Sequence, residues 1–187
     1  MKSWLRFLPV LLLFAAASCA HRSACDAPVL TARDYAIVIP DEATTPERNA
    51  ALELSLTLHR IAGETIPVVA ESMAASPHAI YVGKCRRSEE IAPIDYEKLG
   101  TEGIRLYAKN GDLVLTGGSK RGTVYAVFTF LEDYAGCRWF AEDCVVIPEH
   151  KDFRIPARQP PAQVRAAFPA EDEPGYLRGS RPWADAD

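Results

Sequence analysis

The chain reads Leu115-Thr-Gly-Gly-Ser-Lys-Arg-Gly-Thr-Val-Tyr-Ala-Val-Phe-Thr-Phe-Leu-Glu-Asp-Tyr-Ala-Gly-Cys-Arg-Trp-Phe140 in its most informative stretch. The end of an apolar strand, two glycines, a helix and an aromatic segment follow one another there. Gly117 and Gly118 can adopt the positive φ angles that a sharp exit from a strand requires. Ser119 stands at the expected N-cap, where a hydroxyl accepts a hydrogen bond from the first helical turn. The stretch predicts a strand, a tight turn and a capped helix.

The helix after this turn is indicated by its apolar spacing. Apolar residues recur three or four positions apart, which places them on one buried helical face: Val124, Val127, Phe128, Leu131 and Ala135. Gly136 follows as a helix stop.

A second helix is predicted between Thr44 and Gly63. A threonine cap, a proline in the first turn and Glu47 three residues after Thr44 form a start signal. Residues 53–59 alternate strictly between polar and apolar side chains and also fit a strand. We interpret them as helix because Leu54 and Leu58 belong to a helical stripe and leucine is not β-branched.

The remaining apolar runs predict strands over 35–40, 66–70, 79–83, 103–108 and 112–116, with short strands over 138–140 and 145–147. Asn110-Gly111 lies between two alternating runs and predicts a hairpin. The run 66–70 is expected at a sheet edge or to begin after Pro67. The expected fold is α/β (α+β), with a mixed, partly antiparallel sheet and two main helices on one face.

Residues 1–19 have the layout of an export signal. Lys2 and Arg6 precede an uncharged apolar stretch over 7–17 that is too short to span a bilayer. Ala16-Ala17-Ser18-Cys19 resembles the lipobox of bacterial lipoproteins, which implies lipidation of Cys19; simple cleavage near Ala17 or Ala20 is the alternative. Both interpretations predict an exported protein, periplasmic or at the bacterial cell surface. Any contact with the membrane is expected through a lipid anchor on Cys19 only.

Four cysteines remain after Cys19, an even number for an oxidising compartment: Cys25, Cys85, Cys137 and Cys144. Cys137 and Cys144 flank a short aromatic loop, and this pair is the favoured disulfide. The alternative is that Cys137 and Cys85 are small buried hydrophobic residues. No cysteine or histidine spacing is typical of zinc, and we expect no metal or cofactor.

Charge and proline content indicate which partners and which domain boundaries to expect. The formal net charge of −4 becomes more negative when the signal leaves with Lys2 and Arg6, and no basic stripe tracks a phosphate backbone, so we expect no nucleic-acid partner. Half of the prolines lie between Pro148 and Asp187. We therefore expect one domain over 28–148 and a proline-rich linker over 149–187.

Several motifs together resemble a known family. They are Gly103-Ile-Arg105, Arg121-Gly122-x-x-Tyr125, Gly136-Cys-Arg-Trp139 and Val146-x-Pro148. Over about residues 35 to 148 the chain resembles the non-catalytic N-terminal domain of exported bacterial glycoside-hydrolase-like proteins. Relatives of this kind are the N-terminal domain of α-glucuronidases and the second domain of family 20 β-hexosaminidases.

The resemblance implies an accessory domain that braces a catalytic barrel in a protein for polysaccharide or glycan breakdown. A barrel needs roughly 200 residues or more, so we expect this chain to be truncated, with residues 160–165 leading toward the first barrel strand. A stand-alone glycan-binding surface lipoprotein is the alternative. A complete hydrolase is a third hypothesis, weakened because Glu132 and Asp133 are sequence neighbours and cannot face each other across a sugar.

The candidate site residues follow from these hypotheses. The segment with Gly117, Gly118, Ser119, Arg121 and Gly122 is expected to form a structural turn and cap, with binding of a carboxylated or sulfated sugar as the alternative.

Two further residues are candidate contacts. Trp139 and Arg165 are expected to touch either a glycan or the barrel. No residue is assigned a catalytic role.

Overall fold

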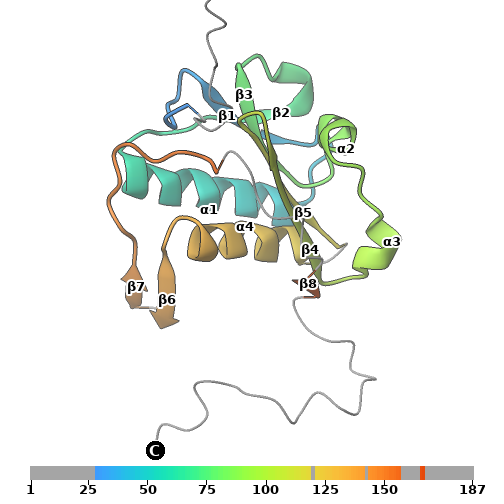
Figure 1. Ribbon diagram of the computed structural model, residues 1–187. Helices are drawn as coiled ribbons and strands as arrows, with labels where there is room; N and C mark the ends of the chain where they lie inside the picture. Colours follow the sequence, from blue (N-terminus) through green and yellow to red (C-terminus); the bar gives the residue numbers. More distant parts are fainter. Residues whose placement is uncertain (1–27, 119–120, 142, 157–164, 167–187) are drawn as a thin grey trace, which may run out of the picture.

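The computed structural model describes residues 28–118, 121–141, 143–156 and 165–166 (Figure 1). A six-stranded sheet runs through its centre. The strands are β1 (Tyr35–Ile39), β2 (Val68–Ala70), β3 (His78–Val82), β4 (Gly103–Lys109), β5 (Asp112–Gly117) and β8 (Arg165–Ala166). Their spatial order is β2-β1-β3-β5-β4-β8. β2, β1, β3 and β5 are parallel, whereas β4 is antiparallel to β5 and to β8.

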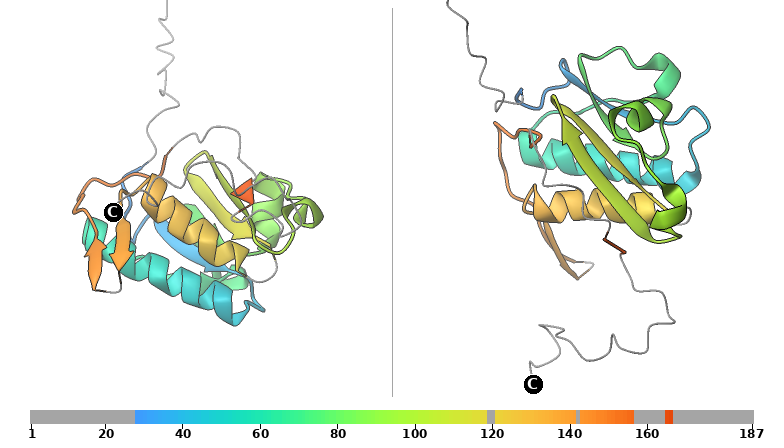
Figure 2. Two further views of the ribbon diagram at one scale, coloured as in Figure 1. Left: turned by 90° about the horizontal axis from the view of Figure 1, so that it is seen from below. Right: turned by 45° about the vertical axis from the view of Figure 1, so that its right-hand side comes forward.

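Helices cover both faces of this sheet (Figure 2). α1 (Thr45–Ala62) and α4 (Gly122–Asp133) lie side by side on one face. The short helices α2 (Arg86–Ile91) and α3 (Tyr96–Leu99) lie on the other, and a 3-10 turn occupies Glu71–Met73. The predicted α/β class, mixed sheet and shared face of the two main helices are confirmed. The two short helices were not predicted because each has too few residues to show a period.

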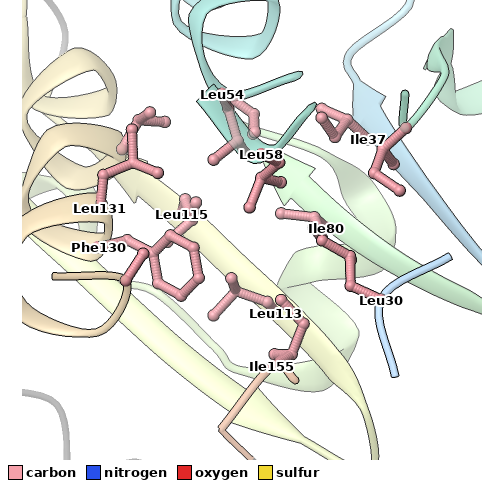
Figure 3. Close-up of a cluster of buried hydrophobic side chains, with 14 of the residues drawn as sticks. Leu30, Ile37, Leu54, Leu58, Ile80, Leu113, Leu115, Phe130, Leu131 and Ile155 are labelled. Carbon is pink, nitrogen blue, oxygen red and sulfur yellow. The ribbon is translucent and has the colours of Figure 1, made fainter. Parts of the chain in front are cut away.

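The main core lies between the sheet and the α1–α4 pair (Figure 3). Side chains alternate along each strand, so every second residue faces these helices. Ile37, Ile80 and Leu115 face them from the sheet and are fully buried. Leu58 and Phe130 meet them from the helices, and burying each such side chain contributes about 1.5–3 kcal/mol.

α1 begins and ends as its sequence predicts. The Glu47 carboxylate accepts hydrogen bonds from the Thr44 backbone N–H and hydroxyl, both at 2.8 Å. Gly63 follows the helix in the left-handed conformation at φ 78°. The ambiguous segment 53–59 is helical, as predicted, and its alternation leaves Leu56 on the outer face, 64% exposed.

The predicted hairpin between β4 and β5 is also confirmed. Asn110 and Gly111 both have positive φ, at 55° and 93°. This is the combination that a two-residue hairpin turn requires. β2 lies at the sheet edge, as expected for the strand that follows Pro67.

The glycines after β5 have a different role from the predicted one. Neither Gly117 nor Gly118 has a positive φ. A β-carbon on Gly117 would lie 2.3 Å from the Gly122 carbonyl carbon and 2.5 Å from the Gly103 oxygen, and one on Gly118 would lie 2.1 Å from the Gly100 oxygen. These glycines let β4, β5 and the start of α4 approach one another closely. The N-cap of α4 is Arg121, without a side-chain hydrogen bond, and Ser119 lies outside the described residues.

The C-terminal boundary also differs from the predicted one. The packed unit continues past Pro148, since Phe153 and Ile155 are 6% and 1% exposed and belong to the main core. The Leu30 N–H donates to the Phe153 carbonyl at 2.8 Å, which ties the two ends of the described unit together. The predicted start of the linker, at residue 149, is therefore several residues too early. Of its later part, only Arg165–Ala166 is described.

The short strands predicted after α4 form a hairpin of their own. β6 (Arg138–Ala141) and β7 (Cys144–Val146) pair with each other and not with the main sheet. The register shifts between Trp139 and Ala141, which marks a β-bulge at Phe140.

The hydroxyl group of Tyr35 in the core leads to a testable prediction. Its hydroxyl is buried and has no hydrogen-bond partner among the described residues. Burial, with the Asp112 and Asp34 carboxylates adding to it, raises the pKa of Tyr35 to about 12. An unpaired buried hydroxyl costs about 1–3 kcal/mol, so Tyr35→Phe is expected to raise the free energy of unfolding by about 1 kcal/mol at pH 7.

The same substitution has a pH signature. The unfolded chain loses the Tyr35 proton near pH 10, below the folded pKa of about 12. Between these values the unfolded state binds fewer protons, so wild-type stability falls as pH rises. Urea unfolding of both proteins at pH 7 and pH 11 should show that Tyr35→Phe reduces this alkaline loss. A parallel loss in both proteins would contradict the assignment.

Candidate binding cleft and exposed hairpin

A cleft of about 620 Å³ opens at the carboxyl ends of the parallel strands. The segments after β1, β3 and β5 contribute to it, together with the start of α1 and with α3. The lining residues are Pro40, Glu42, Thr44, Pro46, Glu47, Lys84, Tyr96, Glu97, Gly100, Thr101, Gly117, Gly118 and Thr123. This volume is within the range of small-molecule sites.

Glu47 holds one wall of the cleft together. Its carboxylate caps α1 through Thr44, and it also accepts a hydrogen bond from the Lys84 backbone N–H at 3.2 Å. A β-carbon on Gly83, which has φ 98°, would lie 2.4 Å from the Glu47 carboxylate. Glycine at 83 therefore allows the segment after β3 to reach the start of α1.

Lys84 and Tyr96 form another part of the lining. The Lys84 ammonium lies 4.5 Å from the centre of the Tyr96 ring, a cation–π contact. The Tyr96 hydroxyl lies 3.5 Å from the Thr116 hydroxyl. Burial raises the pKa of Tyr96, and the contact with Thr116 opposes this shift. Tyr96 therefore remains a neutral phenol at pH 7.

The predicted turn borders this cleft. Gly117 and Gly118 belong to its lining. Arg121 is exposed, with its Nε 3.7 Å from the Glu102 carboxylate, and Gly122 is buried. The arginine of the turn thus has an acidic neighbour.

The β6–β7 hairpin has one packed face and one exposed face. Trp139 packs edge-to-face on Phe128 of α4, with ring centres 5.0 Å apart. On the outer face, Phe140 and Val146 are 70% and 51% exposed. Arg138 fixes the hairpin to α4 because its guanidinium donates to the carbonyl of Glu132 at 2.6 Å.

The structure leaves Trp139 and Arg165 on separate elements. Trp139 is half-buried on the hairpin, so its ring is already in contact with protein. Arg165 lies in β8, where it pairs with Ile104 at the edge of the main sheet. In Figure 1 both lie toward the bottom of the molecule, the hairpin at the left, after the end of α4, and β8 at the right, beside β4.

The disulfide predicted between Cys137 and Cys144 is not formed, and both residues are free thiols. Cys137 is buried beside α4, whereas Cys144 is exposed and pairs with Ala141 across the hairpin. Four residues of strand separate Ala141 from Cys137, about 13 Å at the usual rise. That separation exceeds what a disulfide can bridge.

Cys85 fits the alternative of a buried small residue. It is fully buried, and burial raises the pKa of its thiol. Cys19 and Cys25 lie outside the described residues.

Two cleft residues were missed by sequence reasoning. Neither Lys84 nor Tyr96 was predicted as a site residue. Lys84 could have been identified from its position just after a parallel strand. The carboxyl ends of parallel strands meet at one edge of a sheet, where ligands commonly bind. No signal in the sequence indicated Tyr96, whose helix has four residues.

A second hollow, of about 520 Å³, lies beside α2. Its charges are already paired: the Arg86 Nε lies 3.9 Å from the Glu71 carboxylate, and Arg87 pairs with Glu90. The Glu71 carboxylate also accepts hydrogen bonds from the backbone N–H groups of Arg86 and Arg87 at 3.1 and 2.8 Å. Within the described ranges, no group of three or more histidine, cysteine or acidic side chains could hold a metal ion.

The arrangement defines an α/β domain with a mixed sheet, a cleft at the strand ends and a projecting apolar hairpin. The chain belongs to the family described as the glycosyl hydrolase family 67 N-terminus, whose model matches residues 24–130, more than half of its length. This match confirms the expected resemblance to a glycoside-hydrolase N-terminal domain. No curated protein matches the sequence.

Three similar solved structures are each much longer than this chain. A family GH20 β-N-acetylhexosaminidase from Streptomyces coelicolor A3(2) is 20% identical with a TM-score of 0.39, covering 55% of this chain and 17% of its own. A Streptomyces plicatus β-hexosaminidase is 17% identical with a TM-score of 0.38 and the same coverage. A family GH115 4-O-methyl-α-glucuronidase, BtGH115A, is 22% identical with a TM-score of 0.44, covering 71% of this chain and 18% of its own. The chain thus spans less than a fifth of the length of these proteins.

None of the helices described is long and apolar enough to cross a membrane.

Proposed function

We propose that this chain is the accessory, non-catalytic N-terminal domain of an exported protein that degrades glycans, and that its partner is a catalytic domain. The match to the glycosyl hydrolase family 67 N-terminus is the observation that carries this proposal. Fractionation of the native bacterium into cytoplasm, periplasm and membranes tests the export, which the residues before Cys19 suggest. Recovery in the cytoplasm alone contradicts it.

The outer face of the β6–β7 hairpin is the proposed contact with the catalytic domain. Phe140 and Val146 expose apolar side chains on the two strands of a ribbon that pairs with no strand of the main sheet. A two-stranded ribbon is marginally stable by itself, and exposed apolar patches of this kind mark interaction surfaces.

The test uses this chain and the catalytic domain as separate purified proteins, after the DNA downstream of the codon for Asp187 has been read for that domain. We expect the double variant Phe140→Ser/Val146→Ser to weaken their association about tenfold or more, because burying the two side chains contributes about 1.5–3 kcal/mol each. The variant should fold normally, since both side chains are exposed. Isothermal titration calorimetry measures the affinity.

Leu52→Ser/Leu56→Ser is the matched control, because it removes two exposed apolar side chains from the outer face of α1. It should leave the affinity unchanged. Equal losses in both double variants would argue against a specific hairpin contact, and a lack of any association would overturn the proposal. The chain alone should not hydrolyse aryl glucuronides or aryl N-acetylglucosaminides; turnover by the purified chain would show that it is catalytic.

A further inference from the structure

The cleft at the ends of β1, β3 and β5 is a consequence of topology. The chain leaves β1 to form α1 on one face of the sheet, and it leaves the neighbouring parallel strand β3 to form α2 on the other face. Where two adjacent parallel strands send their connections to opposite faces, a crevice opens between their carboxyl ends. Ligands of open α/β sheets bind in crevices of this type.

The side chains around this crevice suit a polyol. The lining includes the hydroxyl-bearing residues Thr101 and Thr123, the acidic Glu97 and the basic Lys84. Sugar hydroxyls both donate and accept hydrogen bonds, so they can use acceptors such as carboxylates and a donor such as an ammonium together. Apolar surface from Pro40 and from other lining residues suits the C–H faces of a sugar ring.

The charge of the lining discriminates between sugar classes. Lys84 is the only cation among the described lining residues, which include three acidic residues, Glu42, Glu47 and Glu97. A uronate or sulfated sugar would bring a further negative charge into an acidic crevice, and like charges repel. A neutral sugar incurs no such cost.

We propose that this crevice binds a neutral saccharide unit, with Lys84 and Glu97 as its hydrogen-bonding residues. The choice of a saccharide among neutral polyols rests on the proposed function in glycan breakdown. The crevice itself lies away from the hairpin, so binding here does not depend on docking of a catalytic domain. Glu47 has a positioning role, because its carboxylate is already engaged by Thr44 and by the Lys84 backbone.

The experiment is a titration of the full, isotopically labelled chain with xylobiose, N-acetylglucosamine and glucuronic acid, followed by backbone amide shifts in NMR spectra. We expect at least one neutral sugar to shift amides of the segments with Lys84, Tyr96 and Thr123, with affinity in the millimolar range. Glucuronic acid should bind more weakly than that sugar. Thr123 lies at the start of α4, whereas Trp139 follows its end, so a shift confined to the hairpin would contradict binding at the cleft.

Variants separate a specific site from a weak surface effect. Lys84→Met keeps the aliphatic part of an exposed side chain and removes the ammonium, and it should weaken neutral-sugar binding about tenfold, the loss expected for one charge-assisted hydrogen bond. Lys109→Met, at the other end of β4, is the matched control and should bind as wild type does. Glu97→Gln should reduce the discrimination against glucuronic acid, because it removes one of the repelling charges.

Three results would overturn the inference. One is the absence of amide shifts at the cleft with both neutral sugars. Another is binding of glucuronic acid at least as tight as that of the neutral sugars. The third is equal affinity of Lys84→Met and Lys109→Met. Failure of the hairpin experiment leaves these readouts unaffected, so the two proposals are tested separately.

Discussion

Replacing Gly117 with alanine is expected to destabilise the protein by more than about 3 kcal/mol, at the upper end of what overpacking costs. The new β-carbon would lie 2.3 Å from the Gly122 carbonyl carbon and 2.5 Å from the Gly103 oxygen. Both are backbone atoms, which cannot rotate away as the end of a flexible side chain can. Relief of the clash therefore requires β4, β5 or the start of α4 to move, and Gly122 is itself buried.

The comparison that isolates this effect is Gly63→Ala. Gly63 has φ 78°, but no atom lies within 4 Å of a β-carbon built on it. Alanine there incurs the left-handed backbone cost alone, about 1 kcal/mol. Urea unfolding of both variants, followed by far-ultraviolet circular dichroism, measures the difference. If Gly117→Ala lost no more stability than Gly63→Ala, the close approach of these three segments would not be a constraint.

Local sequence patterns were sufficient to predict the two main helices and the β4–β5 hairpin. Apolar spacing predicted α1 and α4, and the Thr44–Glu47 box and Asn110-Gly111 marked a helix start and a hairpin that the structure contains. Each of these signals depends on neighbours within a few residues in the chain. The packing of the two helices on one face followed from the same patterns, because both needed to bury an apolar stripe.

Features set by distant segments were not predictable in this way. The sequence shows Gly117 and Gly118 before a helix, and a turn with positive φ is the common reason for such a pair. The actual reason is the proximity of Gly103 and Gly100, which precede them by fourteen or more residues and are placed by the β4–β5 pairing. The cleft depends likewise on strand order, since Lys84 and Tyr96 adjoin Thr44 only after β1 and β3 have paired.

The cysteine prediction failed for a related reason. Spacing along the chain placed Cys137 and Cys144 on either side of a short loop, but the separation of two residues in a hairpin depends on register. The bulge at Phe140 and the pairing of Ala141 with Cys144 set that register. Neither the bulge nor this pairing has a distinct signal in the sequence.

The segment after Pro148 was predicted to be a linker because of its proline content, although it belongs to the folded domain. Phe153 and Ile155 are single apolar residues between charged and proline residues, so no period identifies them as core. In the structure, the Phe153 ring meets Phe130 edge-to-face at 6.4 Å, and its carbonyl accepts the Leu30 N–H. Residues 149–156 therefore close the end of the main core beneath Leu30.

Phe153→Ala is consequently expected to lower the free energy of unfolding by about 3–5 kcal/mol, the range for removing a buried aromatic side chain. The loss combines the transfer of the ring to water with a cavity beside Phe130. Phe140→Ala is the matched control: it makes the same chemical change on a side chain that is 70% exposed, and it should alter stability by about 0.5 kcal/mol or less. Both are measured by urea unfolding of the full chain. Similar small effects of the two substitutions would mean that residues 149–156 are dispensable for the fold and that the domain ends near Pro148, whereas a large loss for Phe153→Ala alone extends it through Ile155.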